Sequence, residues 1–126
     1  MPVKIWTDKV DFEEGTFVGC ESTDDGRLVL SAGYSTATWT SQTYYATDWV
    51  RWAMLLAECI RTVGSNIFFR FKSGTTQGEC ESSDWSPYFG NITADGQFAE
   101  SLRAYFLNNP TATVGAYVKV EVTLES

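Results

Sequence analysis

Acidic side chains stand in adjacent pairs at two places in the first quarter of the chain. Glu13 and Glu14 form one pair, and Asp24 and Asp25 form the other. Paired carboxylates can act as general acid and base when burial raises the pKa of one member. Both pairs lie in polar segments that read as turns, where no neighbouring residue would remove a carboxylate from water. We interpret them as solvated turn residues and expect no acid–base catalysis from them.

Oxygen ligands for a metal ion are a second reading of the same segments. Asp11, Glu13, Asp24 and Asp25 could converge on a structural calcium ion, because calcium takes carboxylates from irregular loops. The ligand spacing of an EF-hand is absent. Turn chemistry explains the four residues without a metal, so no cofactor is expected and structural calcium remains an alternative.

Nucleophilic catalysis lacks a base, because the chain contains no histidine. The three cysteines, Cys20, Cys59 and Cys80, include no C-x-x-C arrangement and cannot all pair with one another. We expect buried or half-buried free thiols, with a Cys20–Cys80 disulfide as the alternative outside the cell. Neither glycine-rich nucleotide-binding motif is present. The sequence therefore predicts a protein without catalytic residues.

Aromatic residues make up 15% of the chain and are its most unusual feature. Rings in loops can stack on sugars or anchor a protein interface, whereas rings in strands fill a core. We expect core positions for Trp49, Trp52 and Phe69. Several other rings lie near predicted loops and are candidates for contact with a ligand or partner: Trp39, Tyr44, Tyr45, Trp85 and Tyr88.

Charge and length narrow the class of protein further. With 126 residues the chain is expected to form one domain, residues 1–126, in which residues 1–10 could form an N-terminal arm. A net charge of −7 with scattered basic residues disfavours binding to nucleic acid. No apolar run reaches the roughly 18 residues of a membrane span. The N-terminus does not have the layout of a secretory signal, so we expect the protein either to act where it is made or to have had its export signal removed.

The last segment of the chain must hold these residues in place. From Tyr117 to Glu125 apolar and polar residues alternate, which predicts a strand with one buried and one solvated face. The buried face is expected to carry Val118, Val120, Val122 and Leu124. Such a strand requires a second layer to cover it.

Shorter elements precede it. A hairpin is predicted from strands at residues 17–22 and 27–32 around an Asp-Gly turn, and a polar turn at residues 11–16. Residues 49–60 are expected to pair as a strand with the strand at residues 67–72, which leads into a loop at residues 73–78. One short helix is expected within residues 98–108, ended by Pro110. Short strands with regular turns are typical of an antiparallel sandwich or barrel.

Five segments, read together, resemble a known kind of module. They are DFEEGT at residues 11–16, DGRLVL at 25–30, IFFRFKSGT at 67–75, WSPYF at 85–89 and AYVKVEVTL at 116–124. Similar segments occur in galactose-binding-like (discoidin-like) jelly-roll modules of bacteriophage virion proteins and carbohydrate-binding proteins. The chain departs from that pattern at Ala116, where arginine is usual, and in the apolar residues 49–60.

The resemblance implies a mainly β protein, an antiparallel jelly-roll β-sandwich with one short helix. It implies a non-catalytic virion structural protein, either a capsid decoration (cement) protein or a tail accessory protein. Such a protein would form a homo-oligomer in the virion, assembled in the host cytoplasm, and bind the major capsid or other virion proteins. Ile5 and Trp6 of the arm, or the loop with Tyr44 and Tyr45, would make the contact. The alternative is a lectin-like module that binds host-surface glycans.

Overall fold

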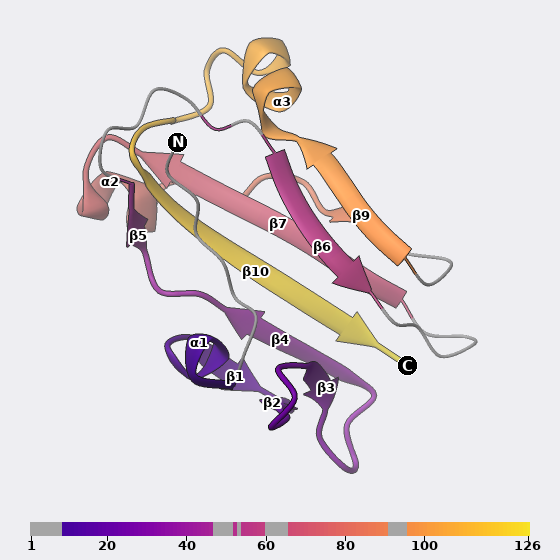
Figure 1. The fold of residues 1–126 in the computed structure, drawn as a ribbon. Helices are drawn as coiled ribbons and strands as arrows, with labels where there is room; N and C mark the ends of the chain where they lie inside the picture. The colour runs from indigo at the N-terminus through magenta and orange to yellow at the C-terminus, as the bar shows by residue number, and fades with distance from the viewer. Residues whose placement is uncertain (1–8, 47–51, 53, 60–65, 91–95) are drawn as a thin grey trace.

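The computed structural model describes residues 9–46, 52, 54–59, 66–90 and 96–126, and within these the protein is mainly β (Figure 1). Its sheets are antiparallel, and the described residues include three short helices. In chain order the elements are α1 (Lys9–Glu13), β1 (Thr16–Val18), β2 (Cys20–Ser22), β3 (Leu28–Leu30), β4 (Thr36–Thr40), β5 (Tyr44–Tyr45), β6 (Met54–Cys59), β7 (Asn66–Gly74), α2 (Gln77–Ser82), β8 (Phe89–Gly90), β9 (Gly96–Ser101), α3 (Leu102–Asn108) and β10 (Tyr117–Glu125).

The central sheet is built around β10, whose predicted bounds are confirmed. Its strand order is β1-β4-β10-β7-β8, and β5 pairs with one end of β10. Strands β7 and β10 are paired along nine residues each, from Tyr117 opposite Gly74 to Glu125 opposite Asn66. This ladder joins the two halves of the sheet.

One face of the central sheet carries the core. Val120 lies opposite Phe71, and Val122 lies between Phe69 and Trp39, all on this face. Two small sheets, β2–β3 and β6–β9, supply the second layer and lie in front of the central sheet in Figure 1. Under the first, Cys20, Ala37 and Trp39 form one buried cluster. Under the second, Phe71, Leu102 and Val120 form another.

Gly19 explains why the predicted strand at residues 17–22 is two strands. Its φ of +76° interrupts the extended backbone between β1, which joins the central sheet, and β2, which joins the hairpin. The hairpin itself is confirmed, with Cys20 opposite Leu30 and Ser22 opposite Leu28. Its turn contains Gly26 at φ +82°, a conformation that glycine adopts without steric cost.

The predicted partner of the strand within residues 49–60 is wrong. Strand β6 pairs with β9, because β7 is already bonded to β10 on one side and to β8 on the other. Strand β9 occupies the first part of the segment predicted as helical, so the helix begins only at Leu102. There the Ser101 hydroxyl caps it by accepting a hydrogen bond from Ala104 N at 3.1 Å.

Two further helices replace segments predicted as a turn and a loop. Helix α1 covers the first half of the predicted turn at residues 11–16 and begins at Lys9, inside the predicted arm; residues 1–8 lie outside the described residues. Helix α2 begins within the predicted loop at residues 73–78, where the Thr76 hydroxyl accepts from Glu79 N at 3.0 Å. A side-chain cap of this kind can start a helix without an apolar stripe.

The two cysteines whose side chains are described are buried free thiols, so the alternative Cys20–Cys80 disulfide does not form. Cys20 lies beside Trp39, and its Sγ donates to Thr38 O at 3.3 Å. Cys80 lies in α2, with its Sγ 3.6 Å from Lys72 O. Burial raises the pKa of both thiols, which keeps them protonated.

Candidate interaction site

The second face of the central sheet carries mostly polar side chains. Because side chains alternate along a strand, residues paired with Glu121 and Thr123 point away from the core with them. We name this surface the threonine-rich face, and its members are Thr16, Val18, Thr36, Thr38, Thr40, Asn66, Phe68, Arg70, Lys72, Lys119, Glu121, Thr123 and Glu125. It was expected to be solvated, but Glu121 is only 7% exposed.

Arg70 accounts for the burial of Glu121. Its Nε donates to Glu121 Oε1 at 2.7 Å and its Nη2 to Oε2 at 3.0 Å, a two-pronged ion pair between neighbouring strands. Such a pair fixes the plane of the guanidinium. The hydrogen bonds to Glu121 raise the pKa of Arg70, so the cation is permanent.

Trp85 and Tyr88 flank this guanidinium from the edge of the sheet. Ser86 ties their segment to β7, donating its N–H to Phe71 O at 2.8 Å and accepting from Phe71 N at 3.0 Å. The Arg70 Cζ then lies 4.8 Å from the Trp85 ring centre and 4.9 Å from that of Tyr88. Both distances fit cation–π contacts. Tyr88 is 54% exposed, so this site presents an aromatic surface to solvent.

Two more residues complete what we call the Trp85–Tyr88 patch, namely Phe68 and Lys72. The Phe68 ring meets that of Tyr88 edge-on at 6.1 Å. The Lys72 ammonium lies 4.6 Å from the Trp85 ring centre and donates to Glu81 O at 2.8 Å. With Arg70, Trp85 and Tyr88, they form a surface of rings and cations that can bind by stacking and by charge.

A small pocket adjoins the patch at Trp85. Its volume is about 130 Å³, several times what one water molecule requires. Rings, hydroxyls and one carboxylate line it, among them Asp84, Trp85, Ser86, Tyr105, Thr111 and Thr113. This combination can accept and donate hydrogen bonds beside an apolar ring.

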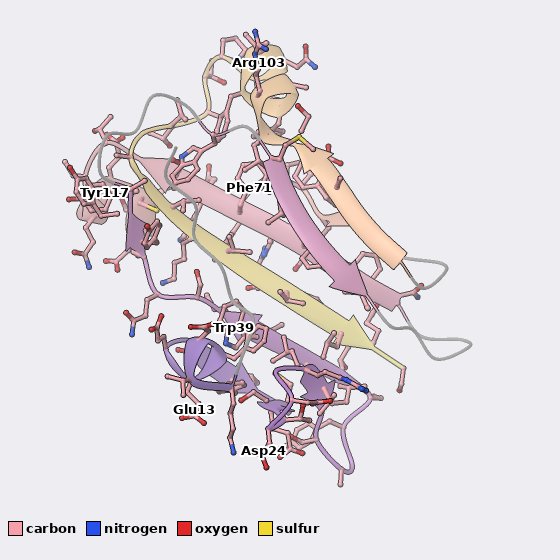
Figure 2. The ribbon with its side chains drawn as sticks, viewed as in Figure 1. Glu13, Asp24, Trp39, Phe71, Arg103 and Tyr117 are labelled. Carbon is pink, nitrogen blue, oxygen red and sulfur yellow. The ribbon has the colours of Figure 1, made fainter. Side chains whose placement is uncertain are left out.

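Tyr45 and Tyr117 form a second aromatic surface near α2. Their ring centres are 4.9 Å apart with planes tilted by 37°, because the two residues are paired between β5 and β10. Tyr45 is 51% exposed, whereas Tyr44 is half-buried opposite Val118. In Figure 2 the side chain of Tyr117 lies at the left edge of the molecule, whereas Glu13 and Asp24 lie at its lower end.

The other predicted contact residues are distributed differently. Trp39 is 1% exposed, its Nε1 donates to Phe12 O at 2.8 Å, and its ring meets that of Phe12 edge-on at 5.2 Å. It belongs to the core, so we leave it out of the candidate site. Ile5 and Trp6 lie outside the described residues. Sequence reasoning thus placed Trp85 and Tyr88 among the candidates but did not bring them together.

The acidic residues considered as calcium ligands are partly paired with basic residues. Lys9 Nζ lies 3.3 Å from Asp24 Oδ1, and Arg27 Nε lies 3.1 Å from Asp25 Oδ2. A hydrogen bond from Thr23 and, to a smaller extent, the charge of Arg27 lower the pKa of Asp25. Among the described residues no group of three or more acidic or sulfur side chains is arranged to hold a metal ion.

Sequence reasoning did not assign a site role to Arg70, Lys72 or Glu121. Alternation placed Glu121 on the solvated face of its strand, but the strand that contains Arg70 and Lys72 was not known to be its neighbour. The usable signal was an arginine and a glutamate, each isolated among alternating apolar residues in two long strands. Opposite charges at such positions favour direct cross-strand pairing.

No family model matches the chain, and searches of curated proteins and of solved structures find no significant match. None of the helices in the described residues is long and apolar enough to cross a membrane.

Proposed function

We propose that this protein is a non-catalytic adhesion protein of a virion, a capsid decoration or tail accessory subunit built on a jelly-roll type of sandwich. In this proposal the two small sheets and the central sheet are the two layers of the sandwich. The assignment to a virion is supported by the motif resemblance, and the mode of action by the geometry of the Trp85–Tyr88 patch.

The observation that carries the adhesive role is the Arg70 guanidinium, held between the rings of Trp85 and Tyr88 and clamped by Glu121. Trp, Tyr and Arg are the residues that dominate binding energy at protein interfaces. A side chain already fixed in the unbound protein loses little conformational entropy on binding. The patch therefore has both the composition and the rigidity of an interface anchor.

Neighbouring virion proteins are the proposed partners, with the chain acting as a homo-oligomer. The Tyr45–Tyr117 surface, at the end of the sheet near α2, is a second contact surface available to them. Nucleic acid is not among the proposed partners, because a net charge of −7 repels the phosphate backbone.

Purified particles of the phage that encodes the chain provide the test. Mass spectrometry should find the protein in a fixed ratio to the major capsid or tail protein. Tyr88→Ala should reduce its copy number per particle at least fivefold, whereas Glu13→Gln on the exposed side of α1 should leave it unchanged. Absence of the wild-type protein from particles would contradict the proposal.

Glycan binding is the second candidate, and the pocket beside Trp85 favours it. Asp84, Thr111 and Thr113 offer the hydrogen-bonding groups, and Trp85 the ring, that a sugar requires. Titration with a glycan library should then change Trp fluorescence, and Thr113→Val should weaken that binding while leaving particle incorporation intact. No fluorescence change with any glycan would rule this candidate out.

A further inference from the structure

We propose that the threonine-rich face binds the same face of a second copy of this chain, with the two β10 strands antiparallel. The inference rests on the proposed function, because it takes this surface to be adhesive. It adds that the partner bound at this surface is a second copy of the chain. It is carried by the order of charges along the face.

The face consists of rows that run across the strands. Lys119 and Lys72 are paired and form a basic row. Next comes the row of Thr16, Thr40, Glu121 and Arg70, in which the two charges neutralise each other. A threonine and apolar row follows, with Val18, Thr38, Thr123 and Phe68, and then a row with Thr36, Glu125 and Asn66. Charge thus changes from positive to negative along β10.

This order selects one way of packing two copies face to face. A two-fold axis that runs along the strands would place each basic row on the same row of the partner. An axis that runs across the strands at the level of Val122 places Lys119 over the partner's Glu125, and Glu125 over the partner's Lys119. Opposite charges then meet twice by symmetry, as in any isologous dimer.

The side chains available for pairing fit this arrangement. Lys119 and Glu125 are both half-buried, and within the described part of the chain neither belongs to an ion pair. The middle rows meet each other, so the mutually neutralised Arg70–Glu121 pair lies against threonine and apolar side chains. Val18, which is 60% exposed, would be covered. Two sheets pack at about 10 Å when such inner faces interdigitate.

The ends of the face limit how far the copies can slide. Helix α2 stands over the end near Gly74, where a Cβ on that glycine would meet Cys80 N at 2.5 Å and Cys80 Cα at 2.9 Å. The other end of the face is the end of β10 at Glu125. In the proposed dimer the last residues of one copy approach α2 of the other.

Charge exchange tests the pairing. Lys119→Glu and Glu125→Lys should each weaken the dimer at least tenfold in sedimentation equilibrium, because two attractive contacts become repulsive. The double variant Lys119→Glu/Glu125→Lys should bind within about threefold of wild type, since the pairs are restored with reversed sign. Glu13→Lys makes the same charge change on α1 and should have no effect. Far-ultraviolet circular dichroism confirms that each variant is folded.

A zero-length cross-link between lysine and carboxylate gives an independent readout. Lys119 and Glu125 of one strand are six residues and about 20 Å apart, too far for a link within one copy. A Lys119–Glu125 link between isotopically distinct copies is therefore expected. The inference is overturned if the wild-type chain remains monomeric up to roughly 0.1 mM. It is also overturned if the double variant fails to recover binding.

These outcomes separate the inference from the proposed function. A chain that is incorporated into particles but stays monomeric overturns the inference and the proposed homo-oligomer, and leaves the virion assignment standing. A dimer that is absent from particles overturns only the virion assignment.

Discussion

The indole Nε1 of Trp52 donates to the hydroxyl of Ser73 at 3.0 Å and to the carbonyl of Gly115 at 2.7 Å. Ser73 is 1% exposed, and its Oγ also accepts from Gly115 N at 3.0 Å. It lies 2.7 Å from Tyr117 O. One buried hydroxyl thus joins β7, the start of β10 and the segment before β6.

Ser73→Ala should lower the free energy of unfolding by about 1–3 kcal/mol, because it leaves the buried N–H of Gly115 without its acceptor. Urea unfolding followed by circular dichroism measures the change. Ser82→Ala on the exposed side of α2 is the control, with an expected change within about 0.5 kcal/mol. Equal effects of the two substitutions would contradict a central role for Ser73.

The Arg70–Glu121 pair makes a second prediction about stability. Glu121→Ala removes one partner and leaves the partly buried guanidinium without its counter-charge, which should cost roughly 2–3 kcal/mol. Replacing both residues, as in Arg70→Met/Glu121→Leu, should cost much less, because no charge is then left unpaired. Urea unfolding at a fixed protein concentration measures both changes.

A measurement of particle incorporation distinguishes a role of the Arg70–Glu121 pair in adhesion from a purely structural role. Arg70→Met/Glu121→Leu should retain stability but lose particle incorporation, because the cation between Trp85 and Tyr88 is gone. A stable double variant that is incorporated normally would show that the patch does not anchor the contact.

Alternation along single strands is what made much of this fold predictable. Strand β10 and the faces of Phe69 and Phe71 follow directly from a period of two residues. The pairing of β6 with β9 does not, because the pattern of one strand contains no information about its neighbour. The burial of Glu121 escaped prediction for the same reason, since it depends on Arg70 being one strand away.

Helices were harder to predict than strands here because they are short. Helix α2 has a single buried residue, Cys80, so its sequence has no apolar stripe from which a helix could be predicted. Trp39 was predicted to lie near a loop rather than in the core, because its neighbours in β4 are threonines and an alanine, a composition that loops share. Trp85 and Tyr88 were recognisable as ring candidates, but their meeting at Arg70 depends on the Ser86 hydrogen bonds to β7.

Gly19 allows a third prediction, on the point where the chain leaves the central sheet. A Cβ there would lie 2.8 Å from Tyr34 Cδ1 and 3.1 Å from Thr36 O, in addition to the strain of φ +76°. Gly33 has a similar φ of +87° but nothing within 4 Å of its Cβ position. Gly33→Ala should therefore cost about 1 kcal/mol from backbone strain alone, and Gly19→Ala clearly more.

Thermal unfolding of the two alanine variants measures this difference directly. The gap between them isolates the steric contact from the backbone conformation, which both variants share. A Gly33→Ala variant that is as destabilised as Gly19→Ala would mean that the crowding around Gly19 is unimportant.

The last prediction concerns pH and depends on the hydroxyls of Thr23 and Thr43. Thr23 donates to Asp25, and Thr43 donates to Glu81 at 3.0 Å, and each hydrogen bond is the largest cause of a lowered carboxyl pKa. Thr23→Val should raise the pKa of Asp25 and leave Glu81 unchanged, whereas Thr43→Val should do the reverse. Carboxyl NMR titration reads both groups in one sample.

The sign of the linked effect on stability follows from the direction of the shifts. A carboxyl whose pKa is lower in the folded state binds fewer protons there than in the unfolded state. Its contribution to stability is present above the unfolded pKa and is lost as pH falls through the folded pKa. Each valine variant should therefore show a shallower loss of stability than wild type over that acidic range, although both carboxyls are too exposed for a large effect. An unchanged Asp25 pKa in Thr23→Val would show that the charge of Arg27, rather than the hydroxyl, lowers it.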